Sequence, residues 1–412
     1  MLNSANEREL AYVVLIDAIT PIEGYDRVEL AHVGGWTVVV GKGEFLPGDP
    51  AIYFEIDSKL PEVEPFINME FLAKKKFKIT TQKMCKSLSQ GLLMSAKNFG
   101  WDILGINICN NPLADRGIRE SDGTIHLVSD ESRFLTKKLN VTYAEPADNS
   151  RKAPSTDKYK TMSQRHPKIF SKKIVRWFMR REWGRKLMFF FFGKKKDKKN
   201  AWPTHIASKT DVERVQNMMY ILKDKSPYIA TEKVDGSSFT AAAERTKFGR
   251  IKYYVCSRNV SFTNENQTSF YDTNIWYEAY NKYNLKNILT NILKDYNLKN
   301  VAIQAEVYGG KIQQRDYSTN EHKMAVFHIV TNNTKFPINK VVEICDKYGL
   351  PHVPIINWNY TLPDTIEEMQ TFVESAPSAI DGKMKEGIVF YDKETGQTYF
   401  KFVSPEYLMK FH

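Results

Sequence analysis

The chain has 412 residues, of which 42% are hydrophobic and 26% are charged, and this composition excludes a predominantly disordered protein and allows two compact domains. The N-terminus mixes acidic and basic residues where a signal peptide would need a basic start followed by an apolar run. The four cysteines are too dispersed for a zinc ribbon or a disulfide framework, so we expect an intracellular protein with no signal peptide and no transmembrane segment.

The net charge of +11 is concentrated in one segment. Residues 165–200 carry 14 Lys or Arg against two acids, and the rest of the chain is close to neutral. A basic chain often binds nucleic acid, but here the charge belongs to one stretch and not to the predicted domains. Net charge alone therefore does not establish the function.

Residues 1–140 are predicted to form an OB-like β-barrel. Short strands separated by Gly-Gly and Pro-Gly turns, with a spacing of roughly 8–12 residues, are typical of small barrels. The predicted strands are 11–16, 28–33, 36–41, 51–56, 77–81 and 91–94. Trp36, Tyr53 and Phe54 could stack on bases at the barrel surface, or they could fill its core.

Residues 141–200 are predicted to be a linker with a basic aromatic insertion. Residues 144–165 are rich in Pro, Ser, Asp and Lys and show no apolar period. The apolar run at 187–192 has six residues, well below the roughly 20 that span a bilayer. The segment 165–200 could contact phosphates or a membrane surface, or its aromatic residues could pack on a neighbouring domain.

Residues 201–412 are predicted to form a domain of mixed helices and strands. A helix is expected at 210–222, with Thr210 or Asp211 as its N-cap. Strands separated by helical segments suggest antiparallel sheets, so the fold class of the whole chain is predicted to be α+β. The predicted strands are 229–233, 252–257, 301–308, 324–330 and 387–391.

The sharpest chemical feature is the run Glu232-Lys233-Val234-Asp235-Gly236, where a predicted strand enters a glycine turn. A lysine becomes nucleophilic when burial or a nearby cation lowers its pKa. Asp235 would lie on the same side of the extended segment as Lys233 and could bind a divalent metal through water. So short a motif also occurs by chance, in which case Lys233 would be a surface lysine before a turn.

An ordered set of segments supplies the context for Lys233. Together they resemble the motifs of the covalent nucleotidyltransferases, the superfamily of ligases and RNA-capping enzymes. Residues 233–236 resemble motif I, and the segments 257–259, 304–309, 324–329, 385–390 and 400–402 resemble motifs Ia, III, IIIa, IV and V. The resemblance implies ATP-grasp-like antiparallel sheets with helices, and Lys233 as the residue that carries AMP.

The chemistry of the motifs gives each residue an expected role. Charge that builds on the phosphate oxygens needs cations, which Lys401 and Arg258 can provide, and Asp235 and Glu386 are the expected ligands of Mg²⁺ or Mn²⁺. The resemblance implies that Glu306 binds the ribose, that Phe327 stacks on adenine and that Glu232 lies at the base edge. The expected catalytic residues are Lys233, Asp235, Arg258, Glu306, Glu386 and Lys401. The expected nucleotide-binding residues are Glu232, Lys233, Gly236, Arg258, Glu306, Phe327 and Lys401. Taken singly, Phe327 could be core, and Glu306 and Lys401 could be surface residues.

The N-terminal part indicates which group of the superfamily the chain resembles. Segments at 19–26, 34–42, 53–58 and 88–92 resemble the N-terminal OB domain of one group of RNA ligases, and about ten residues follow motif V, too few for the C-terminal OB domain of DNA ligases and capping enzymes. Many relatives carry a second lysine near Lys401, and here Lys383 or Lys385 could take that role.

The resemblance as a whole implies an ATP-dependent RNA ligase. It would seal RNA 3′-OH and 5′-phosphate ends through lysyl-AMP and AMP-RNA intermediates, with Mg²⁺ or Mn²⁺, in RNA repair and as a monomer. Two alternatives stay open. One is a GTP-dependent RNA capping guanylyltransferase, and the other is a non-catalytic RNA-binding protein.

Overall fold

The computed structural model describes residues 1–3, 5, 7–104, 117–119, 125–127, 133–144, 175, 201–209, 211–267, 271 and 273–411. The linker with its basic insertion was predicted at residues 141–200, of which the structure describes 141–144 and 175. Residues 142–143 form a short strand that pairs with residues 58–59 of the N-terminal domain. None of the helices in the described ranges is both long enough and apolar enough to cross a membrane.

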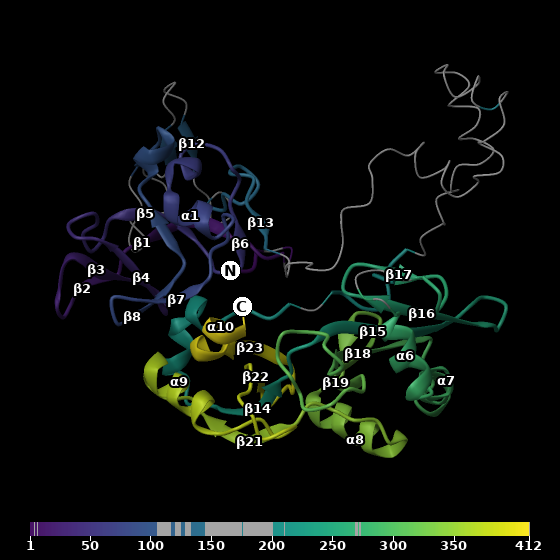
Figure 1. The fold of residues 1–412 in the computed structure, drawn as a ribbon. Coiled ribbons are helices and arrows are strands. Elements are labelled where there is room, and N and C mark those ends of the chain that lie inside the picture. Colours follow the sequence, from purple (N-terminus) through teal and green to yellow (C-terminus); the bar gives the residue numbers. More distant parts are fainter. Residues whose placement is uncertain are drawn as a thin grey trace.

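The N-terminal part is a β domain built from small antiparallel sheets (Figure 1). Strands β1, β5 and β9 form one sheet, β2, β3 and β4 form a second, β10, β11 and β12 form a third, and β7–β8 and β6–β13 form two further pairs. Its elements are β1 (Ala11–Leu15), β2 (Ala18–Ile22), β3 (Tyr25–Val33), β4 (Trp36–Gly41), β5 (Pro50–Phe54), β6 (Ser58–Lys59), η1 (Phe66–Asn68), α1 (Glu70–Lys74), β7 (Thr81–Met84), β8 (Ser87–Gln90), β9 (Leu92–Met94), η2 (Ala96–Phe99), β10 (Asp102–Leu104), β11 (Gly117–Arg119), β12 (Ile125–Leu127) and β13 (Thr142–Tyr143).

The barrel aromatics belong to the core and not to a binding surface. Trp36 is 1% exposed, and Tyr53 and Phe54 are fully buried. The strand predicted at 77–81 is only partly observed: Lys76 and Phe77 form a left-handed turn, with φ angles of 53° and 59°, Lys78 makes an isolated β-bridge with Lys59, and β7 begins at Thr81. The other five strands predicted in this domain overlap observed ones.

The rest of the chain contains two antiparallel sheets. The six-stranded sheet has the order β17-β16-β15-β18-β19-β20 and shares one core with α6, α7 and α8, while the four-stranded sheet has the order β21-β14-β22-β23 and packs against α9. The elements are η3 (Val215–Asn217), η4 (Met219–Lys223), β14 (Pro227–Lys233), β15 (Ser237–Arg245), β16 (Ile251–Ser257), β17 (Ser261–Phe262), α6 (Ile275–Lys282), α7 (Leu285–Asp295), β18 (Asn300–Tyr308), β19 (Lys323–Thr331), β20 (Thr334–Lys335), α8 (Ile338–Tyr348), β21 (Ile355–Thr361), α9 (Ile366–Ser375), β22 (Gly387–Asp392), β23 (Thr398–Val403) and α10 (Pro405–Phe411).

The helix predicted at 210–222 is wrong. Thr210 is outside the described residues, and 211–223 form an extended stretch followed by the short 3-10 helices η3 and η4. Tertiary contacts override the helical pattern: the carbonyl of Glu213 accepts the backbone N–H of Lys401 at 2.8 Å, and that of Gln216 accepts the N–H of Gly35, also at 2.8 Å. This segment therefore joins the four-stranded sheet to the N-terminal domain.

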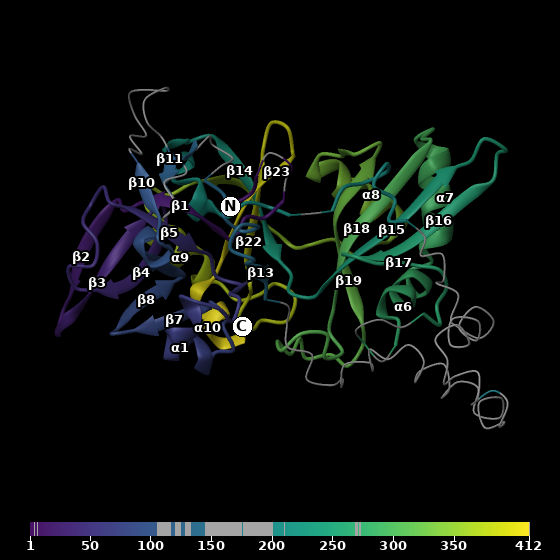
Figure 2. The same ribbon diagram turned by 90° about the horizontal axis from the view of Figure 1, so that it is seen from above.

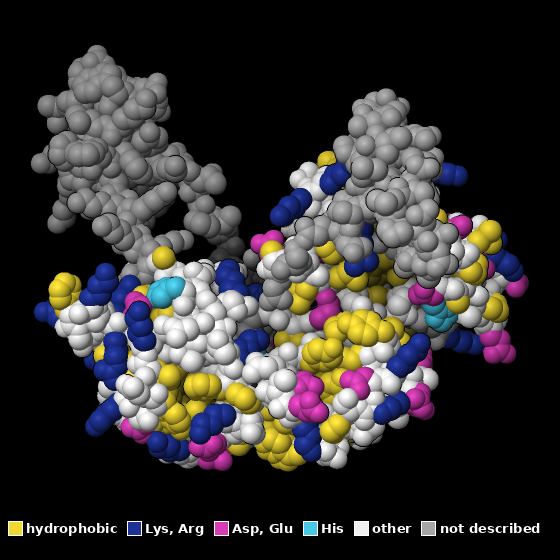
Figure 3. Space-filling model, turned by 180° about the vertical axis from the view of Figure 1, so that it is seen from behind, with side chains coloured by type: hydrophobic (Ala, Val, Ile, Leu, Met, Phe, Trp, Pro, Cys, Tyr) yellow, Lys and Arg dark blue, Asp and Glu magenta, His cyan; other side chains and the backbone are white. Residues whose placement is uncertain are grey.

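Basic and acidic side chains are interspersed over the face shown in Figure 3. No side of that face carries a single sign of charge, so a local basic surface must be identified from the residues themselves.

Candidate nucleotide-binding and catalytic site

Lys233 and Glu386 meet where two paired strands end. Lys233 is the last residue of β14 and lies opposite Gly387, the first residue of β22, so Glu386 comes directly beside it. The Nζ atom of Lys233 lies 2.6 Å from Oε1 of Glu386, and the Lys233 side chain is 25% exposed. The predicted nucleophile is thus held inside the fold and remains accessible to a ligand.

Asp235 and Glu306 come to the same place through a glycine turn. A Cβ atom on Gly236 would lie 2.3 Å from the carbonyl oxygen of Val307, so only glycine lets the turn approach β18 this closely. The backbone N–H of Asp235 donates to the Tyr317 hydroxyl at 2.8 Å. The Asp235 carboxylate accepts a hydrogen bond of 2.6 Å from the Tyr407 hydroxyl on α10.

These carboxylates change the protonation of the cluster. Burial raises the pKa of Glu306 to about 8, with Glu386 and Asp235 adding to the shift and Lys233 opposing it. Burial also disfavours the charged form of Lys233, but Glu386, Glu306 and Asp235 outweigh it and raise the pKa of the amine. In the protein without nucleotide the amine of Lys233 is therefore held as a cation, because three acids surround it.

The acids fit a divalent cation that is shared with phosphates. Oε2 of Glu386 is buried and has no hydrogen-bond partner among the described residues. In the same ranges, no group of three or more His, Cys, Asp or Glu side chains could by itself hold a metal. Mg²⁺ at nucleotide sites commonly takes one or two carboxylates and completes its shell with water and phosphate oxygens. Asp235 and Glu386 are suited to that arrangement.

Two cations meet a carboxylate on the other side of the site. The Nζ atom of Lys401 lies 3.2 Å from one carboxylate oxygen of Asp211, and Nη2 of Arg258 lies 3.3 Å from the other. Burial lowers the pKa of Lys401 to about 8 although Asp211 opposes the shift. Burial alone would raise the pKa of Asp211, but the cations outweigh it and lower it. The sequence had indicated only a capping role for Asp211.

The other candidate lysines do not join this group. Nζ of Lys383 lies 3.2 Å from a carboxylate oxygen of Asp316, and buried Lys385 donates to the carbonyl of Ala376. Lys401 is therefore the lysine that the structure places beside Asp211 and Arg258.

Glu232 and Phe327 lie around an apolar cluster next to Lys233. The Glu232 carboxylate accepts hydrogen bonds from the Ser378 hydroxyl and, at 2.7 Å, from the N–H of Ala379. Phe327 and Ile380 pack against the cluster Val234, Tyr308, Tyr317, Ala325 and Val353. The expected base-binding residues are thus close to the strand end that carries the nucleophile.

The N-terminal domain is tied to the segment that carries Asp211. Nη2 of Arg214 lies 3.0 Å from a carboxylate oxygen of Asp57, and the Asn217 side chain donates to Glu55 at 2.9 Å and accepts from the Trp36 indole at 2.7 Å. The sequence did not reveal these contacts, because their partners lie more than 150 positions apart.

Comparisons with known proteins show which families and folds the chain resembles. A family model described as RNA ligase matches residues 226–403, and a model described as an OB-fold domain matches residues 10–96. The solved structure of Naegleria gruberi RNA ligase with PPi is 24% identical, with a TM-score of 0.66, and the match covers 98% of this chain and 99% of that one.

Two further structures of the Naegleria gruberi enzyme are mutants. One, with ATP and Mn, is 23% identical with a TM-score of 0.67, and the other, with AMP and Mn, is 24% identical with a TM-score of 0.66. Each match covers 98% of this chain and 99% of that one. No curated protein matches the sequence. The predicted α+β fold, with an N-terminal OB domain before a nucleotidyltransferase domain, is confirmed.

Proposed function

The chain carries an RNA ligase domain at residues 226–403 behind an N-terminal OB fold, and on this premise we propose that it is an ATP-dependent RNA ligase. The observation that carries the proposal is the Lys233 amine, 2.6 Å from Glu386 and within the electrostatic reach of Asp235 and Glu306. The Naegleria gruberi structures hold ATP, AMP or PPi, with Mn in the first two cases, and this is the chemistry that we propose here.

In the first step Lys233 attacks the α-phosphorus of ATP. A nitrogen–phosphorus bond forms, the bond to the bridging oxygen breaks, and pyrophosphate leaves. The amine must first lose a proton, and Oε1 of Glu386 is the nearest acceptor. A divalent cation held by Asp235 and Glu386 would neutralise the carboxylate charge that keeps the lysine protonated and would offset charge on the phosphate.

In the next steps AMP passes to an RNA 5′-phosphate, and an RNA 3′-OH then displaces AMP and closes the strand. Lys401 and Arg258 supply positive charge to the phosphates, and the Asp211 carboxylate that they share is exchanged for phosphate oxygens. We assign Glu306 to the ribose and Phe327 to the adenine ring, with Glu232 shaping the base edge through the loop that carries Ser378.

The two alternatives are less well supported. A capping guanylyltransferase would use Lys233 to transfer GMP, whereas the model that matches the catalytic domain is that of RNA ligases. A non-catalytic RNA-binding protein has no need of an amine, carboxylates and cations assembled in one site.

Labelled nucleotide tests the proposal directly. The purified chain is incubated with [α-³²P]ATP or [α-³²P]GTP and Mg²⁺ or Mn²⁺, and we expect covalent label from ATP that is lost in Lys233→Ala. The matched control is Lys347→Ala, on the outer face of α8. Label that persists in Lys233→Ala, or that comes only from GTP, would overturn the assignment.

A sealing assay tests the substrate. Nicked duplexes with RNA or DNA on each side of the nick are compared, and we expect sealing where RNA supplies the ends. We also propose that the chain acts as a monomer in RNA repair. Light scattering should give the mass of one chain, 47.7 kDa.

A further inference from the structure

A lysine cluster lies on the N-terminal domain, outside the site described above. It consists of Lys59, Lys74, Lys75, Lys76 and Lys78, and we call it the α1 lysine cluster. The turn after α1 pairs with β6: the N–H of Leu60 donates to the carbonyl of Phe77, and Lys59 and Lys78 face each other in a β-bridge. Lysines about 20 positions apart in the sequence are thus neighbours in the fold.

The cluster is exposed, and its five lysines outnumber the three exposed acids of the same segment, Glu62, Glu64 and Glu70. Lys59, Lys74, Lys75 and Lys76 are exposed, and none of them forms an ion pair within the part of the chain that the structure describes. Phe71, on the same short helix and one turn before Lys74 and Lys75, is 52% exposed. Unpaired lysines beside an exposed aromatic ring suit a partner with regular negative charge and flat rings.

The backbone at Lys76 has a conformation that residues with side chains seldom adopt. Its φ angle of 53° lies in the left-handed region, where glycine or asparagine is favoured. The next residue, Phe77, has a similar φ of 59°, and its burial in the core accounts for it. Lys76 is exposed, so no packing accounts for a lysine at this position, and unfavourable conformations that are retained often mark functional sites.

The cluster connects to the proposed active site by two routes. Lys59 is two residues from Asp57, which binds Arg214, and the backbone of Arg214 lies beside Lys401. On the other side, β7 follows the cluster in sequence and contacts α10, which carries Tyr407. Strand β7 and α10 lie side by side in Figures 1 and 2. The segments on both sides of the cluster in sequence therefore contact elements that carry residues of the proposed active site.

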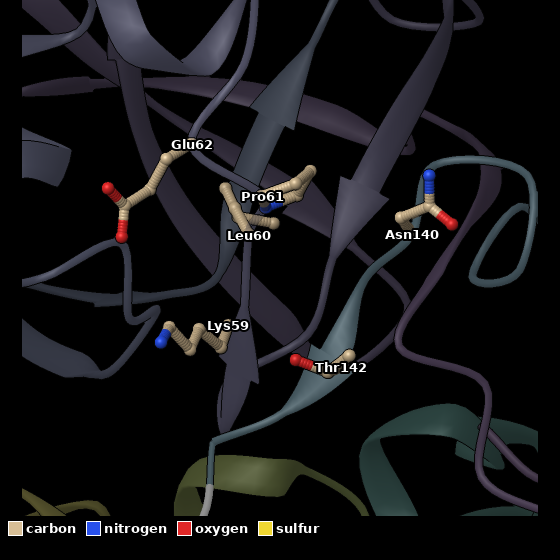
Figure 4. Close-up of a pocket in the computed structure, with 6 residues that line it drawn as sticks. All are labelled: Lys59, Leu60, Pro61, Glu62, Asn140 and Thr142. Atoms are coloured by element: carbon tan, nitrogen blue, oxygen red, sulfur yellow. The ribbon is translucent and has the colours of Figure 1, made fainter. Parts of the chain in front are cut away.

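A pocket of about 300 Å³ opens beside Lys59 (Figure 4). Lys59 and Glu62 lie on one side of it and Asn140 on the other, and it is lined by Lys59, Leu60, Pro61, Glu62, Asn140 and Thr142. Its amide and hydroxyl groups can bond the edge of a base, and pockets of this size hold small ligands.

We propose that the α1 lysine cluster and the pocket beside it bind the RNA strand on one side of the join, outside the catalytic residues. The lysines contact successive phosphates, and Phe71 and the pocket receive bases. This inference rests on the proposed function, since it supplies the surface by which the ligase holds its RNA.

The test compares two triple variants of the full chain. K74A/K75A/K76G removes three charges from the cluster, and glycine at position 76 relieves the left-handed backbone, so the fold is not weakened there. The control, K247A/K286A/K294A, removes the same charge from the hairpin β15–β16 and from α7, at the other end of the molecule in Figure 1. The dissociation constant for a nicked RNA duplex is measured without ATP from 50 to 200 mM salt, beside self-adenylylation and the melting temperature.

We expect the cluster variant to bind RNA at least about tenfold more weakly and to lose about 2.7 from the slope of log K against log salt, for three phosphate contacts at roughly 0.9 each on a duplex. The control variant should bind as the unchanged protein does, and both should self-adenylylate. Equal RNA affinity in the two variants would overturn the inference. So would a cluster variant that keeps its RNA affinity but loses binding to phosphatidylserine vesicles. If the unchanged protein binds RNA but forms no lysyl-AMP, the proposed function fails. The inference about the α1 lysine cluster is then still tested by the RNA affinities of the two variants.

Discussion

Lys233 and Glu386 form an ion pair across the adjacent ends of β14 and β22, with 2.6 Å between Nζ and Oε1. The pair explains why the amine of the nucleotide-free protein has a raised pKa although it is largely enclosed. Lys233 is therefore protonated in the nucleotide-free protein. It can become a nucleophile only when the negative charge of the neighbouring carboxylates is neutralised.

Glu386→Gln should therefore separate two effects. Without the carboxylate the pKa of Lys233 falls, so the acid limb of the pH profile for self-adenylylation moves to lower pH. The maximal rate should nevertheless drop by about a hundredfold or more, because a candidate metal ligand is lost. Single-turnover adenylylation from pH 5.5 to 9 measures both quantities, with exposed Glu394→Gln as the control. An unmoved acid limb would show that Glu386 does not set the protonation of Lys233.

Glu306 makes the stability of the protein depend on pH. Its pKa is about 8 in the fold against an ordinary value of 4.5, so between these values the folded state holds a proton that the unfolded state has lost. Stability from this group is present at low pH and is lost as the pH rises through about 8. In the unchanged protein this loss should reach up to about 1.4 kcal/mol of unfolding free energy per pH unit. Glu306→Gln imitates the protonated acid, so the variant should not show the loss. Urea unfolding of both proteins at pH 5, 7 and 9 checks this, and parallel curves would contradict it.

Motif order and strand period predicted much of this molecule. The predicted strands at 229–233, 252–257 and 301–308 lie within β14, β16 and β18, and the residues expected to be catalytic fall near their ends. These features could be predicted from local sequence because the residues of each motif follow a characteristic spacing within a short segment. Strand β15 was missed, since its alanine run at 241–243 has no strand signal of its own, although the run is buried between two neighbouring strands.

The misses depend on contacts between distant segments. Asp211 was expected only to cap a helix, yet docking against Gly35 and Lys401 keeps its segment extended and turns its carboxylate toward two cations. The raised pKa of Lys233 likewise depends on distant segments, because two of the acids that surround the amine, Glu306 and Glu386, come from other parts of the chain. No periodicity within one segment carries that information.

Asp211 and Lys401 predict a second pH effect. The carboxylate favours the charged form of Lys401, whose pKa is about 8, so Asp211→Asn should lower that pKa further. As the pH rises above neutral, the affinity for ATP should therefore begin to fall at a lower pH in Asp211→Asn than in the unchanged protein. At pH 6.5, where the lysine is charged in both proteins, the variant should bind ATP at least as well, because no carboxylate competes with phosphate.

The KM for ATP between pH 6.5 and 9.5 measures this difference. Lys401→Arg keeps its charge throughout and should flatten the alkaline limb. Lys401→Ala should cost about a hundredfold in adenylylation rate at every pH. Identical alkaline limbs in Asp211→Asn and the unchanged protein would mean that Asp211 does not control Lys401.

Asp57 and Arg214 should couple the N-terminal domain to the catalytic domain. Their side chains are 19% and 7% exposed, and Nη2 of Arg214 lies 3.0 Å from the Asp57 carboxylate. Asp57→Asn leaves the buried guanidinium without its anion and should cost about 3 kcal/mol of unfolding free energy. Arg214→Met removes that unpaired charge, so the double variant should lose less than the two single losses added together, with a coupling of about 1–3 kcal/mol.

Urea unfolding of the four proteins in this cycle gives the coupling. The exposed pair Lys340–Glu343 on α8, with side chains 35% and 61% exposed, is the matched control and should couple by no more than about 0.5 kcal/mol. If Asp57 and Arg214 couple as weakly as that pair, the ion pair does not hold the two domains together. The backbone contact between Gly35 and Gln216 would then be the better candidate, because a Cβ atom at Gly35 would lie 2.7 Å from Cα of Gln216.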